Sequence, residues 1–298
     1  MKTLVIIDGN NQLHRAYHKQ KGLRSPDGRE SGAIYGFSTI LASYMKKYRP
    51  TACICIFDGG RSKHRLNILP DYKGGRVQNL DFDKESFYEQ RDDILELLKA
   101  LNIYTIHKRG EEADDYMYLI SKKYNKQFEN IIIISNDKDF HQLISNRVSI
   151  FSPKDNRLLT KFNYESTKGY KPRQVVDYLI LDGDKSDNIP GYKGFGEKTI
   201  MKFLDKHKSI KDYLSSDEQF GKLDKDVLTE LYWRNKALID IRFFIKKFGI
   251  ELEDGDIIEP KGYIDYATIS ELSDKYGIKT FFKSEFVNAF KKIQSGVL

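Results

Sequence analysis

Short apolar runs that end near an aspartate recur in the first half of the chain. Three of them are Leu4–Ile7 before Asp8, Ala52–Phe57 before Asp58, and Ile131–Ile134 ahead of Asp137. Continuous hydrophobicity over four to six residues is typical of strands that are buried on both faces, as in a parallel sheet. A further apolar run at 103–106 predicts a fourth strand.

Helical periodicity separates these runs. Apolar residues three and four positions apart predict helices over 31–48 and 90–101, and an acidic helix start follows at 111–115. The alternation predicts an α/β fold with a mostly parallel central sheet flanked by helices. After about residue 150 the pattern predicts helices at 175–181, from Glu197 onward, at 222–248 and at 267–293. We therefore expect an α/β core over 1–170 and a helical region over 171–298.

Acidic residues gather where the predicted strands end. A single aspartate there is an ordinary turn former or helix N-cap, and the helix dipole explains one or two acids in a first turn. Neither explains why several strand ends at one sheet edge are acidic. The candidates are Asp8, Asp58, Glu112, Asp114, Asp115, Asp137, Asp139, Asp184 and Asp187.

Carboxylates brought together repel one another unless cations neutralise them. Since no His or Cys stands among these acids, the donors are all oxygen, which favours Mg²⁺ or Mn²⁺ over zinc. Two such ions form the clamp used in phosphodiester cleavage. With these nine acids in one site, the other 34 acids face 50 Lys and Arg residues, so a polyanion is the expected partner.

A glycine-rich segment precedes the helix predicted from Glu197. It does not match a P-loop, because Glu197 stands where that motif needs glycine before lysine. Free backbone N–H groups ahead of a helix can still bind a DNA phosphate without reading bases. An ordinary helix–helix turn is the alternative. The candidate DNA contacts here are Gly191, Lys193, Gly194, Gly196, Lys198 and Thr199.

Composition excludes several classes of protein. With 298 residues and 40% hydrophobic content, the chain is not mainly disordered, and its longest aliphatic stretch, Ile131–Ile134, is far too short to span a bilayer. The apolar run at the N-terminus is too short for a signal peptide. Cys53 and Cys55 alternate on a predicted strand, so we expect buried, reduced thiols. These features predict a cytoplasmic protein without membrane association.

Several motifs in order resemble the 5′ nuclease superfamily, which comprises flap endonucleases, phage replication 5′ exonucleases and the 5′ nuclease domain of bacterial DNA polymerase I. The motifs that carry the resemblance are Ile7–Asn10, Ser31–Phe37, Phe57–Gly59, Tyr72-Lys73 with Arg76, Glu112–Asp115, Ser135–Asp139 and Gly183–Gly191, with looser similarity at Arg234-Asn235.

The resemblance implies a PIN-like nuclease core, a helical arch at about 65–92 through which a single-stranded 5′ end passes, and a helix-three-turn-helix element at about 179–205 that also binds K⁺. It implies two Mg²⁺ ions, for which Mn²⁺ can substitute. Asp58, Glu112, Asp114, Asp137 and Asp139 are expected near the scissile phosphate, and Asp8, Asp115, Asp184 and Asp187 complete the two sites partly through water.

The resemblance also assigns DNA contacts outside the acids. Lys73 and Arg76 match basic arch positions that bind and polarise the reacting phosphate, and Tyr72 is expected to stack on a base. Arg15 matches a basic position on the helix after the first strand. One departure concerns the arch, which is less basic than expected because it contains the acidic residues Asp81, Asp83 and Glu85.

The expected activity is that of a two-metal 5′-3′ exonuclease and flap endonuclease that removes RNA primers and 5′ flaps during replication and Okazaki-fragment processing. Because no polymerase follows before Leu298, the chain resembles a stand-alone, monomeric phage enzyme in the bacterial host cytoplasm. A polymerase or single-strand-binding protein is an expected partner.

Two alternatives remain at this point. A catalytically silent DNA-binding replication protein on the same fold would lack several motif acids, and all of them are present. A metal-dependent phosphatase or single-strand ribonuclease would not need the glycine segment from Gly191 to Lys198.

Overall fold

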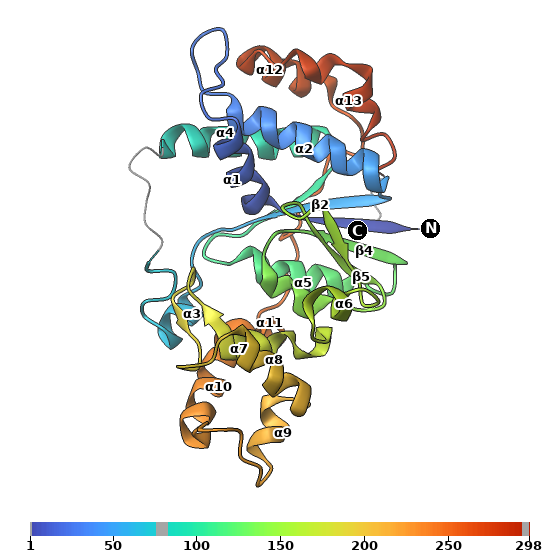
Figure 1. Ribbon diagram of the computed structural model, residues 1–298. Coiled ribbons are helices and arrows are strands. Elements are labelled where there is room, and N and C mark those ends of the chain that lie inside the picture. The colour runs from blue at the N-terminus through green and yellow to red at the C-terminus, as the bar shows by residue number, and fades with distance from the viewer. Residues whose placement is uncertain (1, 76–82, 294–297) are drawn as a thin grey trace. The chain divides into compact units, whose positions relative to one another are not determined.

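The computed structural model describes residues 2–75, 83–293 and 298 (Figure 1). The chain forms two compact units, each built from segments that are distant in sequence. The first unit contains 1–59, 79–136 and 252–298, and the second contains 60–78 and 137–251.

Four parallel strands in the order β3-β2-β1-β4 form the centre of the first unit. They are β1 (Thr3–Asp8), β2 (Ala52–Phe57), β3 (Tyr104–His107) and β4 (Asn130–Ile134). Ile7 pairs with Cys55 on one side and with Ile134 on the other. All four strands predicted from apolar runs are confirmed. Because the strands are parallel and in register, their carboxyl ends lie at one edge of the sheet.

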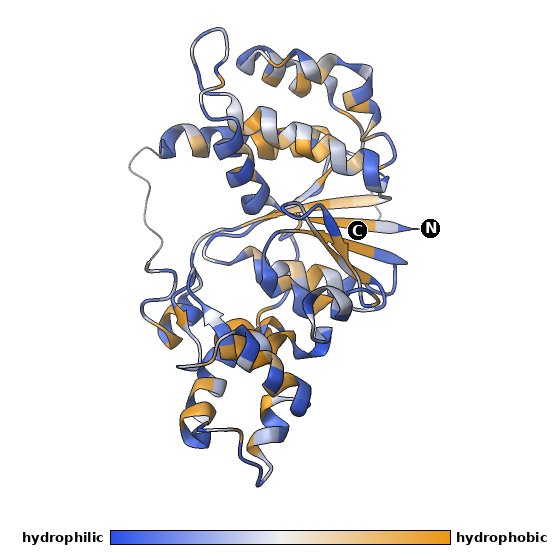
Figure 2. Ribbon diagram, in the orientation of Figure 1, coloured by the Kyte–Doolittle hydropathy of each residue, from blue (hydrophilic) through white to orange (hydrophobic). Residues whose placement is uncertain are grey.

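Helices cover both faces of this sheet. α1, α2 and α4 lie on one face and α5 on the other (Figure 1). The helices of this unit are α1 (Gly9–Lys19), α2 (Gly32–Tyr48), α4 (Lys84–Ala100), α5 (Ala113–Lys123), α12 (Tyr266–Tyr276), η3 (Lys279–Phe282) and α13 (Ser284–Asn288). Hydrophobic residues concentrate on the strands between the two helical layers (Figure 2). This arrangement confirms the predicted α/β class.

Cys53 and Cys55 are both fully buried on β2 and form no disulfide. Burial raises the pKa of each thiol well above its usual value. The prediction of buried, reduced thiols is confirmed.

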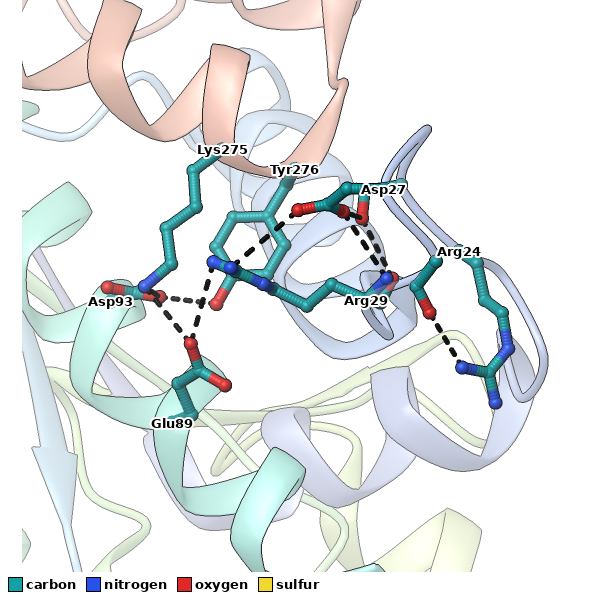
Figure 3. A network of polar contacts seen from close by, with 9 residues as sticks. Arg24, Asp27, Arg29, Glu89, Asp93, Lys275 and Tyr276 are labelled. Carbon is teal, nitrogen blue, oxygen red and sulfur yellow. Dashed lines mark hydrogen bonds and ion pairs between the residues drawn. The ribbon is translucent and has the colours of Figure 1, made fainter.

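A polar network ties α12 to α4 (Figure 3). Lys275 Nζ lies 2.6 Å from Asp93 Oδ2 and 3.2 Å from Glu89 Oε1. The Tyr276 hydroxyl also donates to Asp93, and Arg29, from the segment before α2, lies 3.7 Å from Glu89. The C-terminal segment is therefore an integral part of the first unit.

The second unit is mainly helical. Its β5 and β6 pair antiparallel and were not predicted from the sequence. The elements are α3 (Lys63–Ile68), η1 (Lys138–Leu143), β5 (Val148–Ser152), β6 (Arg157–Leu159), α6 (Tyr164–Lys168), η2 (Pro172–Gln174), α7 (Val175–Asp182), β7 (Gly183–Asp184), β8 (Ile189–Pro190), α8 (Glu197–Lys206), α9 (Ile210–Leu214), α10 (Lys225–Ile239) and α11 (Ile241–Phe248).

The regions 222–248 and 267–293 are helical, as predicted. The first contains two helices that meet at Asp240, which ends α10 and whose carboxylate accepts the Phe243 N–H at 3.0 Å as the N-cap of α11. The second contains α12, η3 and α13. The helix predicted from residue 90 begins at Lys84, where Asp83 is its N-cap. Within the residues described, no helix has the length and apolar character that crossing a membrane requires.

Candidate active site

Asp8 stands where β1 ends and α1 begins. Its Oδ1 accepts the Asn11 N–H at 2.9 Å, which is an N-cap contact, and its Oδ2 accepts the Ser135 hydroxyl at 2.6 Å. Only 8% of Asp8 is exposed. Since Ser135 directly follows β4, this carboxylate links the carboxyl ends of two neighbouring strands and is held by neutral donors.

Asp58 connects the end of β2 to the start of α5. Its Oδ2 accepts from Asn10 Nδ2 at 3.0 Å, and its Oδ1 accepts the Ala113 N–H at 2.8 Å. Asn10 Oδ1 in turn accepts the Asp58 N–H at 3.2 Å. Ala113 is the first residue of α5, so the carboxylate also interacts with the positive end of the helix dipole.

Gly59 allows this approach. Its N–H donates to the Glu111 carbonyl at 2.9 Å, and its own carbonyl accepts the Gly110 N–H at 2.8 Å. A Cβ on Gly59 would lie 1.7 Å from the Lys108 carbonyl oxygen. Only glycine fits there, so the residue after Asp58 fixes β2 against the segment that leads into α5.

The three other predicted acids of the first unit stand at the start of α5. Glu112 occupies the N-cap position and is 1% exposed, Asp115 is fully buried, and Asp114 is half-buried. The N-terminal turn of a helix favours negative charge. Buried carboxylates nevertheless need partners, because desolvating an isolated charge is costly.

In the second unit, Asp137 and Asp139 crowd one another. Asp137 Oδ1 accepts the Asp139 N–H at 2.8 Å. Burial raises the pKa of Asp137, and the charges of Asp187 and Asp184 raise it further. Burial also raises the pKa of Asp139 well above its usual value, with further contributions from Asp137 and Asp184. Both carboxylates therefore resist ionisation in the protein alone.

Asp184 behaves in the opposite way. Burial opposes its ionisation, but hydrogen bonds from Ser186 and the charge of Lys138 outweigh that effect and hold its pKa below the usual value. The Ser186 N–H and hydroxyl lie 2.7 and 2.6 Å from Asp184 Oδ1, and Lys138 Nζ lies 3.6 Å from Oδ2. Asp184 is thus an ionised neighbour of Asp137 and Asp139.

Tyr72 and Lys73 contact the fourth acid of this unit, Asp187. The Lys73 N–H donates to the Asp187 carbonyl at 3.0 Å, and the Tyr72 hydroxyl donates to Asp187 Oδ2 at 3.3 Å. Lys73 has a positive φ of 56° and is 9% exposed, and its charge acts to lower the pKa of Asp137. The ring of Tyr72, for which base stacking was predicted, is only 3% exposed in this arrangement.

Part of the predicted arch lies outside the described residues, including Arg76 and Asp81. The described residues of 65–92 include most of α3 and the first part of α4. The predicted arch and the role of Arg76 stay predictions.

The hairpin of β7 and β8 carries Asp184. Gly183 has a φ of 73°, and a Cβ there would lie 2.3 Å from the Gly191 nitrogen, so glycine is required. The buried Asn235 Nδ2 donates to the Ile180 carbonyl at 3.0 Å and to the Pro190 carbonyl at 2.8 Å. A side chain of α10 therefore fixes the hairpin, and sequence reasoning had not assigned it that task.

The glycine segment after the hairpin leads into α8, whose N-cap is Gly196. Lys193, Gly194 and Lys198 are exposed. The Thr199 N–H donates to the Gly196 carbonyl at 2.9 Å, as in the first turn of a helix. The segment thus presents two ammonium groups and a helix N-terminus to solvent, which suits a phosphate.

Arg15 lies on α1, as predicted. Its Nη1 donates to the Tyr44 hydroxyl at 3.3 Å, and the side chain is half-buried. The structure therefore packs Arg15 against α2 and leaves its predicted DNA contact as a prediction.

The donor chemistry suits a hard divalent cation, although the carboxylates are not gathered as in a closed metal site. In the parts of the chain that the structure describes, no group of three or more His, Cys, Asp or Glu side chains has metal-site spacing. Burial, and after it the charges of neighbouring aspartates, raises the pKa values of Asp137 and Asp139. Mg²⁺ prefers such oxygen donors and keeps several of its waters, so the residues fit it.

Two family models match the chain. The model for the 5′-3′ exonuclease N-terminal resolvase-like domain matches residues 3–177, and the model for the 5′-3′ exonuclease C-terminal SAM fold matches residues 170–242.

Bacterial proteins of this kind are similar over most of the chain. A 5′-3′ exonuclease of Aquifex aeolicus is 36% identical over 261 residues, which cover 86% of this chain and 89% of that protein. DNA polymerase I of Bacillus subtilis is 33% identical over 243 residues, which cover 80% of this chain and 27% of the polymerase.

A solved structure shares the fold. The T5 D15 protein co-crystallised with metal ions has a TM-score of 0.70 at 22% identity, and the match covers 98% of this chain and 99% of that one. A second structure, of the T5 D15 flap endonuclease with DNA and metal ions, matches equally well. The resemblance found in the sequence motifs is confirmed: this chain belongs to the 5′-3′ exonuclease family of phosphodiester hydrolases.

Proposed function

We propose that this 5′-3′ exonuclease is a divalent-metal-dependent, structure-specific nuclease that removes 5′ ends and 5′ flaps from DNA. The observation that carries the proposal is the close pair of Asp137 and Asp139, in which the Asp139 N–H donates to Asp137 Oδ1 at 2.8 Å. Burial, with the charges of neighbouring aspartates, raises the pKa of both carboxylates. The T5 flap endonuclease with the same fold, crystallised with DNA and metal ions, supports the proposal.

In this proposal, the nine predicted carboxylates supply the metal ligands. When bound, two Mg²⁺ ions supply an acidified water and charge stabilisation for the leaving oxygen, and Mn²⁺ can replace them. Asp8 and Asp58 are already oriented by neutral donors before the metal arrives. The remaining proposed ligands are Glu112, Asp114, Asp115, Asp137, Asp139, Asp184 and Asp187.

Basic residues orient the DNA. Lys73 has a positive φ, and its N–H donates to the Asp187 carbonyl. In this proposal its ammonium group binds an oxygen of the reacting phosphate, and Arg76 assists it. Lys193, Lys198 and the N-terminus of α8 hold the duplex backbone within a helix-three-turn-helix element at about 179–205, which also takes K⁺. We further propose that a 5′ end threads an arch at about 65–92 and that the nuclease core ends near residue 170.

The physiological substrates in this proposal are RNA primers and 5′ flaps at replication forks, as in Okazaki-fragment processing, with a polymerase or single-strand-binding protein as partner. A phage origin with action as a monomer in the bacterial host cytoplasm is part of the same proposal. A catalytically silent DNA-binding protein is the second candidate, but every motif acid is present.

Cleavage of a 5′-labelled double-flap DNA tests the proposed function. The enzyme is expected to cut near the single-strand/duplex junction with Mg²⁺, to stop cutting with EDTA, and to lose at least about 100-fold in rate in Asp137→Asn. Binding of the same DNA in Ca²⁺ should survive that substitution. Tight binding without cleavage by the unsubstituted enzyme would favour the silent protein instead, and full activity of Asp137→Asn would refute the metal assignment.

A further inference from the structure

The single tryptophan of the chain is exposed. Trp233 lies on α10 with 52% of its surface accessible, although most large aromatic side chains of this unit are buried or half-buried. Its ring centroid is 6.3 Å from that of Phe243 on α11, with the two rings tilted. Two neighbouring helices thus present a pair of aromatic rings on one surface. Exposure of the apolar indole surface to water is unfavourable.

Cations surround these rings. Lys236 Nζ lies 5.3 Å and Lys247 Nζ 5.9 Å from the centroid of the Phe243 ring. Arg242, Lys246 and Lys247 are exposed on α11, and none of these three pairs with a carboxylate anywhere in the described chain. Lysine and arginine beside exposed aromatic rings are typical of surfaces that bind unpaired nucleotides.

The acids near this surface do not balance its charge. Asp240 neutralises Lys236, at 2.5 Å. Glu230, one turn before Trp233 on α10, is exposed. Asp226, two turns before Trp233, is exposed as well. The three unpaired cations on α11 outnumber these two carboxylates of α10, so the surface favours a polyanion over an acidic or apolar peptide of low charge.

This surface is part of the same helix pair that supports the β7–β8 hairpin. Arg234, the residue after Trp233, donates to the Pro190 carbonyl at 3.3 Å, and Asn235 donates to it at 2.8 Å. A nucleic acid held at the hairpin would therefore have α10 beside it.

We propose that the α10–α11 surface, made of Trp233, Phe243, Arg242, Lys246 and Lys247, is a stacking site for single-stranded nucleic acid. A base stacks on the Trp233 indole, and the three cations of α11 bind the adjoining phosphates. The site deepens the proposed function, on which it rests for the nature of its ligand, and it uses none of the predicted metal ligands or glycine-segment residues.

Because Trp233 is the only tryptophan, its fluorescence reports directly on this site. Oligo(dT) is titrated into metal-stripped enzyme with EDTA, so that no cleavage occurs. Quenching of the emission, together with protection of the indole from acrylamide, is expected. A blunt duplex of the same length should quench far less, since paired bases cannot cover the indole. Two results would overturn the proposal. One is equal quenching of Trp233 by the duplex, and the other is the absence of quenching by oligo(dT) whose binding is detected by fluorescence anisotropy.

Substitutions then separate stacking from charge. In anisotropy with labelled oligo(dT), Trp233→Ala should weaken binding about tenfold, as expected for the loss of one stack, and Trp233→Phe should restore much of it. The double variant Arg242→Glu/Lys246→Glu should also weaken binding and lower the slope of log affinity against log salt by about 1.4 through the loss of two phosphate contacts.

The matched control is Lys208→Glu/Lys211→Glu, which makes the same change of charge at two exposed residues of the same unit. It should leave the quenching of Trp233 nearly intact. An equal loss of oligo(dT) affinity in both double variants would mean that the cations of α11 act only through the overall charge of the protein. Unchanged melting temperatures show that each variant is folded. Quenching without flap cleavage would refute the proposed function alone, whereas cleavage without quenching would refute only this inference.

Discussion

Two pairs of carboxylates, one pair in each unit, are held in opposite ways. In the first unit, Asp8 and Asp58 accept hydrogen bonds from Ser135, Asn10 and the backbone of α1 and α5. In the second unit, Asp137 and Asp139 face other carboxylates, and burial raises the pKa of both.

The difference indicates two tasks. Neutral donors orient a carboxylate without a cation, so the acids of the first unit are arranged before metal arrives. Neighbouring carboxylates repel one another when they are ionised, and a bound divalent cation offsets this repulsion. We therefore expect metal to stabilise the second unit more than the first.

Lys73→Ala removes a cation that acts on Asp137. If Lys73 binds the reacting phosphate, the single-turnover rate of flap cleavage should fall about 100-fold at saturating DNA, because a charged donor to the reacting group is lost. Tyr72→Phe is the matched control, since it removes only a hydroxyl contact to Asp187 at 3.3 Å and should cost far less. An unchanged rate in Lys73→Ala would remove Lys73 from the chemistry.

Asp58→Ala tests the first unit. It leaves the N-terminus of α5 and the amide of Asn10 without their acceptor, so the free energy of unfolding in metal-free buffer should fall by about 2 kcal/mol. Urea unfolding followed by circular dichroism measures the loss. Asp217→Ala, at an exposed aspartate, is expected to change little. Equal stability of Asp58→Ala and the parent would mean that these hydrogen bonds do not orient Asp58.

The pH dependence of stability should differ between the units. The pKa of Asp139 in the folded state lies above the value of about 3.9 for an aspartate in the unfolded state. Between these two pKa values, the folded state therefore binds more protons than the unfolded state. Its contribution is fully present below about pH 3.9 and is lost as pH rises towards the folded pKa. Without metal, Asp139→Asn should therefore lose less stability with rising pH than the parent enzyme. Parallel curves of unfolding free energy against pH for the two proteins would show that Asp139 is not repelled by its neighbours.

The smallest effect is expected from an ordinary ion pair. Lys275→Ala removes one partner of Asp93 and Glu89 between α12 and α4, while Tyr276 and Arg29 remain (Figure 3). Partly exposed pairs contribute little, so unfolding should become easier by about 0.5–1 kcal/mol, independent of Mg²⁺. If the loss of stability depended on Mg²⁺, the effect of metal would not be confined to the proposed metal-binding carboxylates.

The sequence predicted the elements that depend on local pattern. Four apolar runs gave the four parallel strands, and the aspartates after β1 and β2 stand at the sheet edge as expected. These predictions succeeded because burial on both faces of a strand leaves a continuous hydrophobic signal.

Features that depend on distant partners were missed. Gln90 accepts the N–H groups of Ala33 and Ile34, more than 50 residues away, and no local pattern encodes that cap. Likewise, Ser135 and Asn10 are ordinary polar residues until the sheet brings them to Asp8 and Asp58. The break at Asp240 was visible as a capping residue, but the apolar periodicity on both sides concealed it.

Thermal unfolding of Asp139→Asn measures the repulsion in the second unit. In EDTA this variant should melt at a higher temperature than the parent enzyme, because one crowded carboxylate is neutralised. Mg²⁺ should raise the melting temperature of the parent more than that of the variant. A variant that melts lower than the parent in EDTA, with an undiminished Mg²⁺ shift, would show that Asp139 is not destabilised by its neighbours.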